Sequence, residues 1–268
     1  MNDRLEVRVE GPPNAPTLIY LPGIHGDWYL VTSFRRAVVS QVRFVEFCYP
    51  RTTTWSLEEH ARAILSALQE RGIERGWLLG ESFGSQIAWA MLSQIAAGTR
   101  FEVSGLILAG GFVRYPWMGG VRLTRALIAG LPDPAVRLLF LGYARYARFR
   151  HRQAPETLES MDEFIRRRLA PGDREAVLHR LDLIARSDPR ARARSTAIDT
   201  WFLSGFWDPV VPWIPVRRWL RRECPGWRSD RVLPRADHTV LATQPRQSAE
   251  VILGWMERGA SGLQSGDQ

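Results

Sequence analysis

The stretch WLLGESFGSQIAWA, residues 77–90, places a serine between two glycines at the junction of two apolar runs. The first run is short and ends at Gly80, as a buried strand does, whereas the second repeats its apolar residues at helical spacing. The residues from Gly80 to Gly84 fit the pattern G-x-S-x-G, which between a strand and a helix holds the serine in a strained turn with its hydroxyl above the sheet edge. A serine that only caps the following helix is the alternative for this motif by itself.

Apolar runs of strand length flank this stretch on both sides. They cover residues 15–23, 42–50, 103–111 and 200–208. Between the strand-like runs lie segments with helical spacing, residues 56–72, 83–98 and 244–259. The first of these helical segments opens with a capping box formed by Ser56 and Glu59. Alternating strands and helices need crossover connections, which predicts an α/β fold with a mostly parallel central sheet flanked by helices.

The pattern changes from Val113 to Ser195, where helical segments separated by proline and glycine follow one another without a strand-like run. A helical block of this length between two strands is best explained as an insertion that leaves the sheet and returns to it. We therefore expect a core formed by residues 1–112 and 196–268, and a helical insertion formed by residues 113–195.

The composition is that of a globular protein, with 268 residues of which 45% are hydrophobic and 24% charged. No apolar run approaches the length of a membrane span, and the sequence does not open with a basic segment followed by an apolar one. We expect a soluble cytoplasmic protein without a transmembrane segment. Cys48 and Cys224 lie far apart and have no metal-ligand spacing around them, which predicts two free thiols and no metal site.

The basic residues of the chain are all arginines, and they give a net charge of +8. Residues 113–195 contain 17 of the 36 arginines but only 9 of the 28 acidic residues, so the excess lies in the helical insertion. Arginines spread over solvated helix faces are the simpler explanation, and a segment that steers an anionic substrate or binds a lipid surface is the alternative. Because no zinc spacing, base-stacking motif or helix-turn-helix accompanies the arginines, we expect no nucleic-acid partner.

A serine hydroxyl is a weak nucleophile at neutral pH, so Ser82 requires a base and an acid that orients the base. For a serine at a strand-to-helix turn, the acid and then the histidine follow in the chain, each after a later strand. Asp208 ends one strand-like run, and His238 follows a short apolar segment ahead of the last helical segment. We predict that Ser82, His238 and Asp208 act as nucleophile, base and orienting acid.

The other histidines in helical segments fit the role of base less well. His60 falls on the polar side of its helix, and His151 and His179 lie in the insertion. We expect all three side chains to be solvated or to serve packing.

Other acids near the strand ends are also weaker candidates. Asp237 is adjacent to His238 in a loop, where neighbouring side chains seldom face one another. Asp199 precedes its strand and would lie at the opposite edge of the sheet, and the loop of residues 110–112 contains no acid. Asp208 is therefore favoured by elimination as well as by placement.

Acyl transfer also needs hydrogen-bond donors for the oxyanion of the tetrahedral intermediate. One is normally the amide of the residue after the nucleophile, here Phe83, and the second comes from the loop after an early strand. The segment YLPGIHGD supplies such a loop, and the amide of Ile24 is the candidate donor. Glu81 and His25, next to these positions, are candidate substrate contacts, although an ordinary loop histidine is the simpler explanation of His25.

Taken together, these motifs resemble the α/β-hydrolase family over the whole chain except residues 113–195. Residues 80–84 resemble its nucleophile elbow, Asp208 its acid, and His238 with the following TVLATQP its histidine loop. LPGIHG is similar to its H-G-x-x-G oxyanion loop, with Pro22 where histidine is usual. That departure weakens the assignment of the second oxyanion donor.

The resemblance implies further features. Residues 113–195 fall where the family places a helical cap, which would cover the site and select substrates. The segments IYLPGIHG, CYPR and GESFG also resemble, more loosely, a branch with lipase-like and acyltransferase-like members. A serine at the elbow argues against haloalkane and epoxide chemistry, for which members of the family use aspartate.

These features predict a serine hydrolase that cleaves a carboxylic ester or thioester through an acyl-enzyme, with no metal or organic cofactor. The substrate would be a small-molecule or lipid-like acyl ester, and the arginine excess suggests an anionic one. Nothing in the sequence indicates the oligomeric state. Two alternatives remain: an acyltransferase that passes the same acyl group to an alcohol, and a ligand-binding protein on a hydrolase scaffold that has lost turnover.

Overall fold

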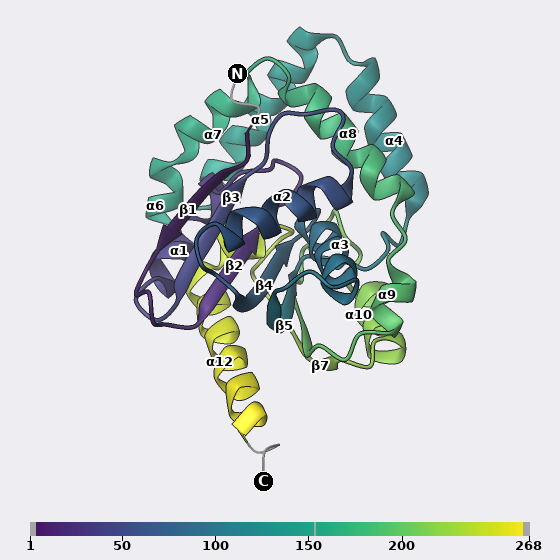
Figure 1. Ribbon diagram of the computed structural model, residues 1–268. Coiled ribbons are helices and arrows are strands. Elements are labelled where there is room, and N and C mark those ends of the chain that lie inside the picture. Colours follow the sequence, from purple (N-terminus) through teal and green to yellow (C-terminus); the bar gives the residue numbers. More distant parts are fainter. Residues whose placement is uncertain (1–3, 153, 265–268) are drawn as a thin grey trace.

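A seven-stranded sheet runs through the centre of the computed structural model, which describes residues 4–152 and 154–264 (Figure 1). The strands lie in the order β1-β3-β2-β4-β5-β6-β7; β1 pairs antiparallel with β3, and the other pairs are parallel. The predicted mostly parallel sheet is therefore confirmed. The strands are β1 Glu6–Glu10, β2 Thr17–Leu21, β3 Arg43–Cys48, β4 Arg75–Glu81, β5 Glu102–Ala109, β6 Thr200–Gly205 and β7 Trp227–Leu233.

Of the two strands at the edges of the sheet, β1 was not expected from the sequence, and β7 was expected only as a short apolar segment ahead of His238. Charged and apolar residues alternate in the EVRVE of β1, and the WRSDRVL of β7 is mostly polar. An edge strand has a single neighbour, and charged side chains on it are common because part of the strand faces water. Neither segment therefore forms the continuous apolar run that marks a buried parallel strand.

Helices cover both faces of the sheet (Figure 1). Helices α2 and α3 pack together on one face, and α1 and α12 on the other. The predicted capping box is present at the start of α2, where the Glu59 amide donates to Ser56 Oγ at 3.1 Å and the Ser56 amide donates to the Glu59 carboxylate at 2.6 Å. The helices of the core are η1 Tyr29–Val31, α1 Thr32–Val38, α2 Leu57–Gln69, α3 Gly84–Ala96, α10 Trp213–Glu223, α11 Val240–Thr243 and α12 Pro245–Gln264.

The chain between β5 and β6 contains helices and, in its described part, no strand. Most of these helices lie over one end of the sheet (Figure 1), and residues from them and from the core line a common cavity there. None of the described helices combines the length and the apolar composition needed to cross a bilayer. The helices of this insertion are α4 Met118–Gly130, α5 Asp133–Arg150, α6 Pro155–Glu159, α7 Met161–Arg168, α8 Asp173–Arg186 and α9 Arg190–Arg194.

Strand β4 lies in the middle of the sheet between the parallel strands β2 and β5, and all of it after Arg75 is buried. The chain passes from β4 into α3 within two residues, which brings the first turn of α3 against the end of β2. A Cβ atom on Gly84 would lie 2.0 Å from the carbonyl oxygen of Leu21. Since no side chain tolerates that distance, only glycine allows α3 to approach β2 so closely.

Gly84→Ala is expected to lower the free energy of unfolding by about 3 kcal/mol, because α3 must move away from β2 to admit the methyl group. Gly142→Ala is the matched control, since Gly142 is exposed in α5 and an added Cβ there meets no other part of the described chain within 4 Å. This control is expected to raise the free energy of unfolding by about 1 kcal/mol. Urea unfolding measures both changes, and equal values would contradict the close approach of α3 to β2.

Candidate active site

Ser82 lies at the sharp turn between β4 and α3. Its φ angle is +50°, and it is the one residue other than glycine with a positive φ in the described part of the chain. The Ser82 amide donates to the carbonyl of Ala109 at 3.0 Å, which extends the β4–β5 ladder by one residue before the chain turns. A Cβ on Gly80 would lie 2.9 Å from the Cα of Ser85, so the return of the chain past β4 requires glycine there. The backbone of Ser82 is strained and is held by its neighbours.

His238 lies in the loop between β7 and α11, with its Nε2 atom 2.9 Å from Ser82 Oγ. Its ring packs over Gly110, which follows β5 with a φ of +55°. A Cβ on Gly110 would lie 2.9 Å from the carbonyl oxygen of His238 and 3.3 Å from Nδ1. The space that the imidazole occupies therefore depends on glycine at this position.

Asp208 follows β6 and holds the other side of the imidazole. Its Oδ2 atom lies 2.8 Å from His238 Nδ1, and its Oδ1 atom accepts from the amides of Val210 and Val211, both at 2.8 Å. The side chain of Asp208 is fully buried. Because the carboxylate accepts the Nδ1 proton, the Nε2 lone pair faces the Ser82 hydroxyl, which is the tautomer that a general base needs.

The competing acids have other partners. Asp237 accepts from the amide and hydroxyl of Thr239 and from Arg150, and makes no hydrogen bond with the adjacent His238. Asp199 lies before β6, at the opposite end of that strand from Asp208, and is paired with Arg228.

Among the described contacts, Ser82 Oγ is bonded to His238 and to no competing histidine, although His151 lines the same cavity. One expectation about the competing histidines is wrong. His60 is not on a polar face; it is 1% exposed and packs edge-on against Tyr49, Trp55 and Phe83. The loop before α2 covers the side of the helix that carries His60, although the sequence pattern predicts that this side faces water. The buried face of α2 is therefore wider than the stripe of apolar residues on it.

Comparison with known proteins identifies the family. The model described as the Alpha/beta hydrolase family matches residues 19–251. The chain belongs to the alpha/beta hydrolase family. The resemblance drawn from the motifs of the sequence is thereby confirmed.

Solved structures share the fold of this alpha/beta hydrolase. A hydrolase from Pseudomonas aeruginosa PA01 matches over 94% of each chain with 17% identity and a TM-score of 0.74. An esterase from Thermogutta terrifontis matches over 95% of this chain and 93% of its own with 19% identity and a TM-score of 0.72. An enol-lactonase from Burkholderia xenovorans LB400 matches over 94% and 96%, with 18% identity and a TM-score of 0.73. At these identities the likeness establishes the fold alone, and no curated protein sequence matches the chain.

The surroundings of His238 stabilise its protonated form. Burial by itself lowers the pKa of the imidazole, but the hydrogen bond and the negative charge of Asp208, with smaller contributions from Glu81 and Asp237, raise that pKa above its ordinary value. An imidazole in this position accepts a proton more readily than a free one. An imidazolium at this position is therefore stabilised by its surroundings.

The two amides expected to bind an oxyanion lie beside Ser82. Phe83 is the N-cap residue of α3, and Ile24 lies in the loop after β2. That loop approaches Ser82 closely, because a Cβ on Gly23 would lie 3.5 Å from the Cβ of Ser82. In the described structure neither amide donates to a protein acceptor. Both N–H groups are therefore free to bind a developing negative charge.

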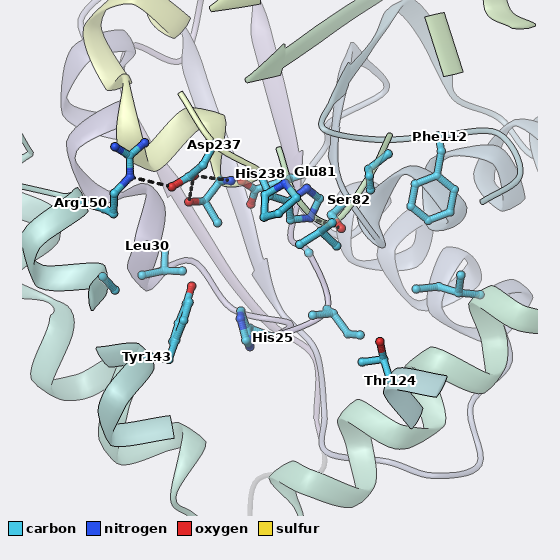
Figure 2. Close-up of a pocket in the computed structure, with 18 of the residues that line it drawn as sticks. His25, Leu30, Glu81, Ser82, Phe112, Thr124, Tyr143, Arg150, Asp237 and His238 are labelled. Carbon is cyan, nitrogen blue, oxygen red and sulfur yellow. Dashed lines mark hydrogen bonds and ion pairs between the residues drawn. The ribbon is translucent and has the colours of Figure 1, made fainter. Parts of the chain in front are cut away.

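A cavity of about 440 Å³ opens beside Ser82 and His238. Figure 2 shows these two residues with Glu81 along one side, and His25, Tyr143 and Thr124 across from them. The insertion provides Tyr115, Val121, Thr124, Tyr143, Tyr146, Ala147, Arg150, His151, Leu181 and Ile184, and the core provides Tyr20, Leu30, Phe112, Trp207, Val210 and Val211 among others. The cavity is thus enclosed by both parts of the chain, and its wall is mainly apolar and aromatic.

Glu81 and His25 both reach the cavity wall with an unused polar atom. Glu81 is 7% exposed and accepts from Tyr20 Oη at 2.5 Å, while its Oε1 atom has no partner in the described structure. Burial raises the pKa of Glu81, although the hydrogen bond from Tyr20 opposes that change. Burial, followed by the charges of Arg168 and Arg180, lowers the pKa of His25 well below its usual range, so its imidazole is neutral. Its Nδ1 atom is buried without a partner in the described part of the chain.

The sequence did not identify the insertion residues of the cavity wall, Tyr20, or the ion pair between Arg150 and Asp237 at 3.1 Å. In the sequence, Tyr20 lies in an apolar strand-like run, and only its hydroxyl indicates that it could bond to a buried acid such as Glu81.

The predicted free thiols are confirmed, since Cys48 and Cys224 are both unpaired and buried. Within the described residues, no three histidine, cysteine, aspartate or glutamate side chains gather as metal ligands would.

The pH dependence of ester cleavage is expected to follow His238. Since the base acts when neutral, kcat/KM should rise with pH through the pKa of His238, which lies above the ordinary 6.5, and should fall as acid protonates the ring. Asp208→Asn removes the charge that raises this pKa, so the acid limb should move to lower pH while kcat falls by about 10⁴-fold. Rates of ester hydrolysis across the pH range measure both effects. Asp199→Asn, at the far end of β6, is the control, and an unmoved acid limb in Asp208→Asn would contradict the assignment.

Proposed function

We propose that this alpha/beta hydrolase cleaves a carboxylic ester or thioester through an acyl-enzyme formed on Ser82. The observation that carries the proposal is the continuous hydrogen-bonded chain from Asp208 through His238 to Ser82, with distances of 2.8 and 2.9 Å. These are the contacts by which a base activates a hydroxyl and an acid orients the base. Their position at the wall of an apolar cavity supports an acyl group as the part of the substrate that is bound.

The first half of the reaction forms the acyl-enzyme. Ser82 Oγ attacks the carbonyl carbon as its proton moves to His238 Nε2, and the carbonyl oxygen becomes an oxyanion. The amides of Phe83 and Ile24 bind this oxyanion, and Asp208 stabilises the imidazolium. The intermediate then collapses, the bond to the alcohol or thiol breaks, and His238 donates its proton to the leaving oxygen or sulfur.

The second half returns the enzyme to its starting state. Water takes the place of the leaving group, and His238 accepts one of its protons as the oxygen attacks the acyl carbon. Collapse of the second tetrahedral intermediate breaks the bond to Ser82 Oγ, which recovers the proton from His238 and releases a carboxylic acid. Neither half requires a metal or an organic cofactor. An acyltransferase would follow the same course with an alcohol in place of water.

Residues 113–195 act in this proposal as a cap that covers the site and selects the substrate. They supply more than a third of the described lining residues, mostly apolar and aromatic side chains. Glu81 and His25, with one unused polar atom each, contact a polar group of the substrate. A cytoplasmic location stays a prediction from the sequence.

The charge on the cavity wall bears on the anionic substrate suggested by the arginine excess. Arg150 is the one arginine among the described lining residues, and it is paired with Asp237. Asp27 and Glu81 add further carboxyl groups to the same wall. The wall therefore supports an uncharged acyl ester in preference to an anionic one.

The nucleophile is tested with a fluorophosphonate probe and p-nitrophenyl esters of increasing acyl length. The wild-type protein should be labelled and should turn over these esters, with an optimum at the acyl length that fills the cavity. Ser82→Ala should lose labelling, and its kcat should fall by about 10⁴-fold or more because the covalent route is removed. An unlabelled, inactive but folded wild type would favour a ligand-binding protein, and product transferred to added alcohols in preference to water would favour an acyltransferase.

The charge preference is tested by comparing a neutral ester with an ester of similar shape that ends in a carboxylate. We expect higher kcat/KM for the neutral ester, and a change of no more than about twofold in kcat/KM of the anionic ester when salt is added. The reason is that the arginine on the described wall already has a carboxylate partner, which leaves little attraction for salt to screen. A steep loss with salt for the anionic ester alone would support steering by the arginines of the insertion.

A further inference from the structure

The loop that carries the proposed oxyanion donor Ile24, residues 23–27, is held through its backbone carbonyls. Four consecutive carbonyls each accept one hydrogen bond: Gly23 from the Gly26 amide at 2.9 Å, Ile24 from Arg180 Nη1 at 2.8 Å, His25 from Arg168 Nη1 at 2.8 Å, and Gly26 from the Tyr49 amide at 2.8 Å. Two of these four bonds come from the backbone of the core. The other two come from arginine side chains of the insertion.

Both arginines reach the loop from helices of the insertion. Arg168 is the last residue of α7, and its side chain is 4% exposed; Arg180 lies in α8 and is 2% exposed. Burying a guanidinium costs free energy unless its donors find partners. Arg168 also pairs with Asp27 at 2.7 Å and Asp173 at 3.0 Å, and Arg180 also donates to the carbonyl of Pro50 at 3.1 Å. Each arginine thus has a partner in the loop, which is the carbonyl of His25 together with Asp27 for Arg168 and the carbonyl of Ile24 for Arg180.

The shape of the loop and the position of Arg180 fit each other. Gly26 has a φ of +73°, which favours glycine, and a Cβ there would lie 2.6 Å from Nη1 of Arg180 and 2.7 Å from its Cζ. The guanidinium therefore lies directly against the turn that closes the loop. Burial, followed by the charge of Arg168, lowers the pKa of Arg180 to about 10, so it is still protonated at neutral pH and donates to both of its carbonyls.

These contacts fix the direction of the Ile24 amide. In a trans peptide the N–H and C=O groups point in opposite directions, so holding a carbonyl also sets the amide of the same peptide plane. The carbonyl of Gly23 shares its plane with the Ile24 N–H and is held by the turn to Gly26. The carbonyl of Ile24 is held by Arg180, so the planes on both sides of Ile24 are fixed while its N–H remains free.

We propose that Arg180, assisted by Arg168, is a positioning residue that holds the loop of residues 23–27 in the shape that binds the oxyanion. The insertion then does more than enclose the substrate, since the second oxyanion donor is in place only when α7 and α8 are seated on the core. This inference rests on the proposed acyl-enzyme chemistry. It adds to that chemistry a dependence on two side chains that never touch the reacting atoms.

Arg180→Met and Arg180→Lys test this role, with Arg174→Met as the matched control. Arg174 lies on the same helix and also donates to backbone carbonyls, but these belong to Ile128, Ala129 and Leu131 within the insertion. Since displacing a catalytic group by about 1 Å costs about 10²-fold in rate, kcat of Arg180→Met should fall by about that factor while KM changes less. Arg180→Lys, which keeps one donor and the charge, should recover part of the loss, and Arg174→Met should keep the wild-type kcat.

Thionoesters supply the measurement that a merely structural role would not change. Their sulfur is too large and too weak an acceptor to use the oxyanion donors well, so wild type should prefer the oxoester, and Arg180→Met should lose most of that preference. Thermal unfolding establishes that each variant is folded; if Arg180→Met is not, Arg180→Lys and Arg168→Lys are compared with wild type by the same oxoester-to-thionoester ratio. A ratio equal to that of wild type in the folded variants would overturn the inference. An active wild type and an inactive Ser82→Ala would leave the proposed function standing in that case.

Discussion

The left-handed backbone of Ser82 is the constraint around which the site is arranged. A positive φ at a residue with a side chain costs of order 1 to 3 kcal/mol and persists only where its neighbours determine it. Here the bond from the Ser82 amide to Ala109 fixes the chain before the turn, and Gly80 and Gly84 let α3 fold back against β2 and β4. One turn thereby places the hydroxyl over the sheet edge and the amide of Phe83 beside it, so the proposed nucleophile and one proposed oxyanion donor depend on the same turn.

A parallel sheet brings the other two residues to the same edge. The carboxyl ends of β4, β6 and β7 all point the same way, so the loops after them meet although Ser82 and His238 are 156 residues apart. Within those loops the backbone does most of the positioning. The amides of Val210 and Val211 donate to the carboxylate of Asp208, which orients it toward the imidazole. The absence of a side chain on Gly110 leaves space for the imidazole ring. The order of the motifs along the chain indicates a common site because the parallel sheet brings the loops after these strands to the same edge.

The meeting of strand ends at one sheet edge explains which parts of the fold and of the candidate site could be predicted from the sequence. Ser82, Asp208 and His238 each follow a strand, and strand ends are visible as short apolar runs closed by glycine, proline or aspartate. Strand β1 and the polar part of β7 were not predicted, because an edge strand needs no apolar run. His60 was placed on the wrong face because the loop before α2 covers a side of the helix whose sequence is polar. Arg168 and Arg180 gave no signal, because each contacts a backbone carbonyl more than 140 residues away, and any residue type presents such a carbonyl.

The arginines of the insertion show why net charge by itself says little about a partner. The excess of +8 suggests an electrostatic surface, yet the two most buried of these side chains bind groups in the interior, where a lysine would replace only part of the guanidinium's contacts. Arg168 bonds a carbonyl and two carboxylates at once, which requires the several donors of a planar guanidinium rather than the point charge of an ammonium. Arg168 pairs with two buried acids, and both arginines hold backbone carbonyls of the core from outside the sheet. A helical insertion joined to the core in this way can vary along its cavity wall while it still holds the loop that faces Ser82.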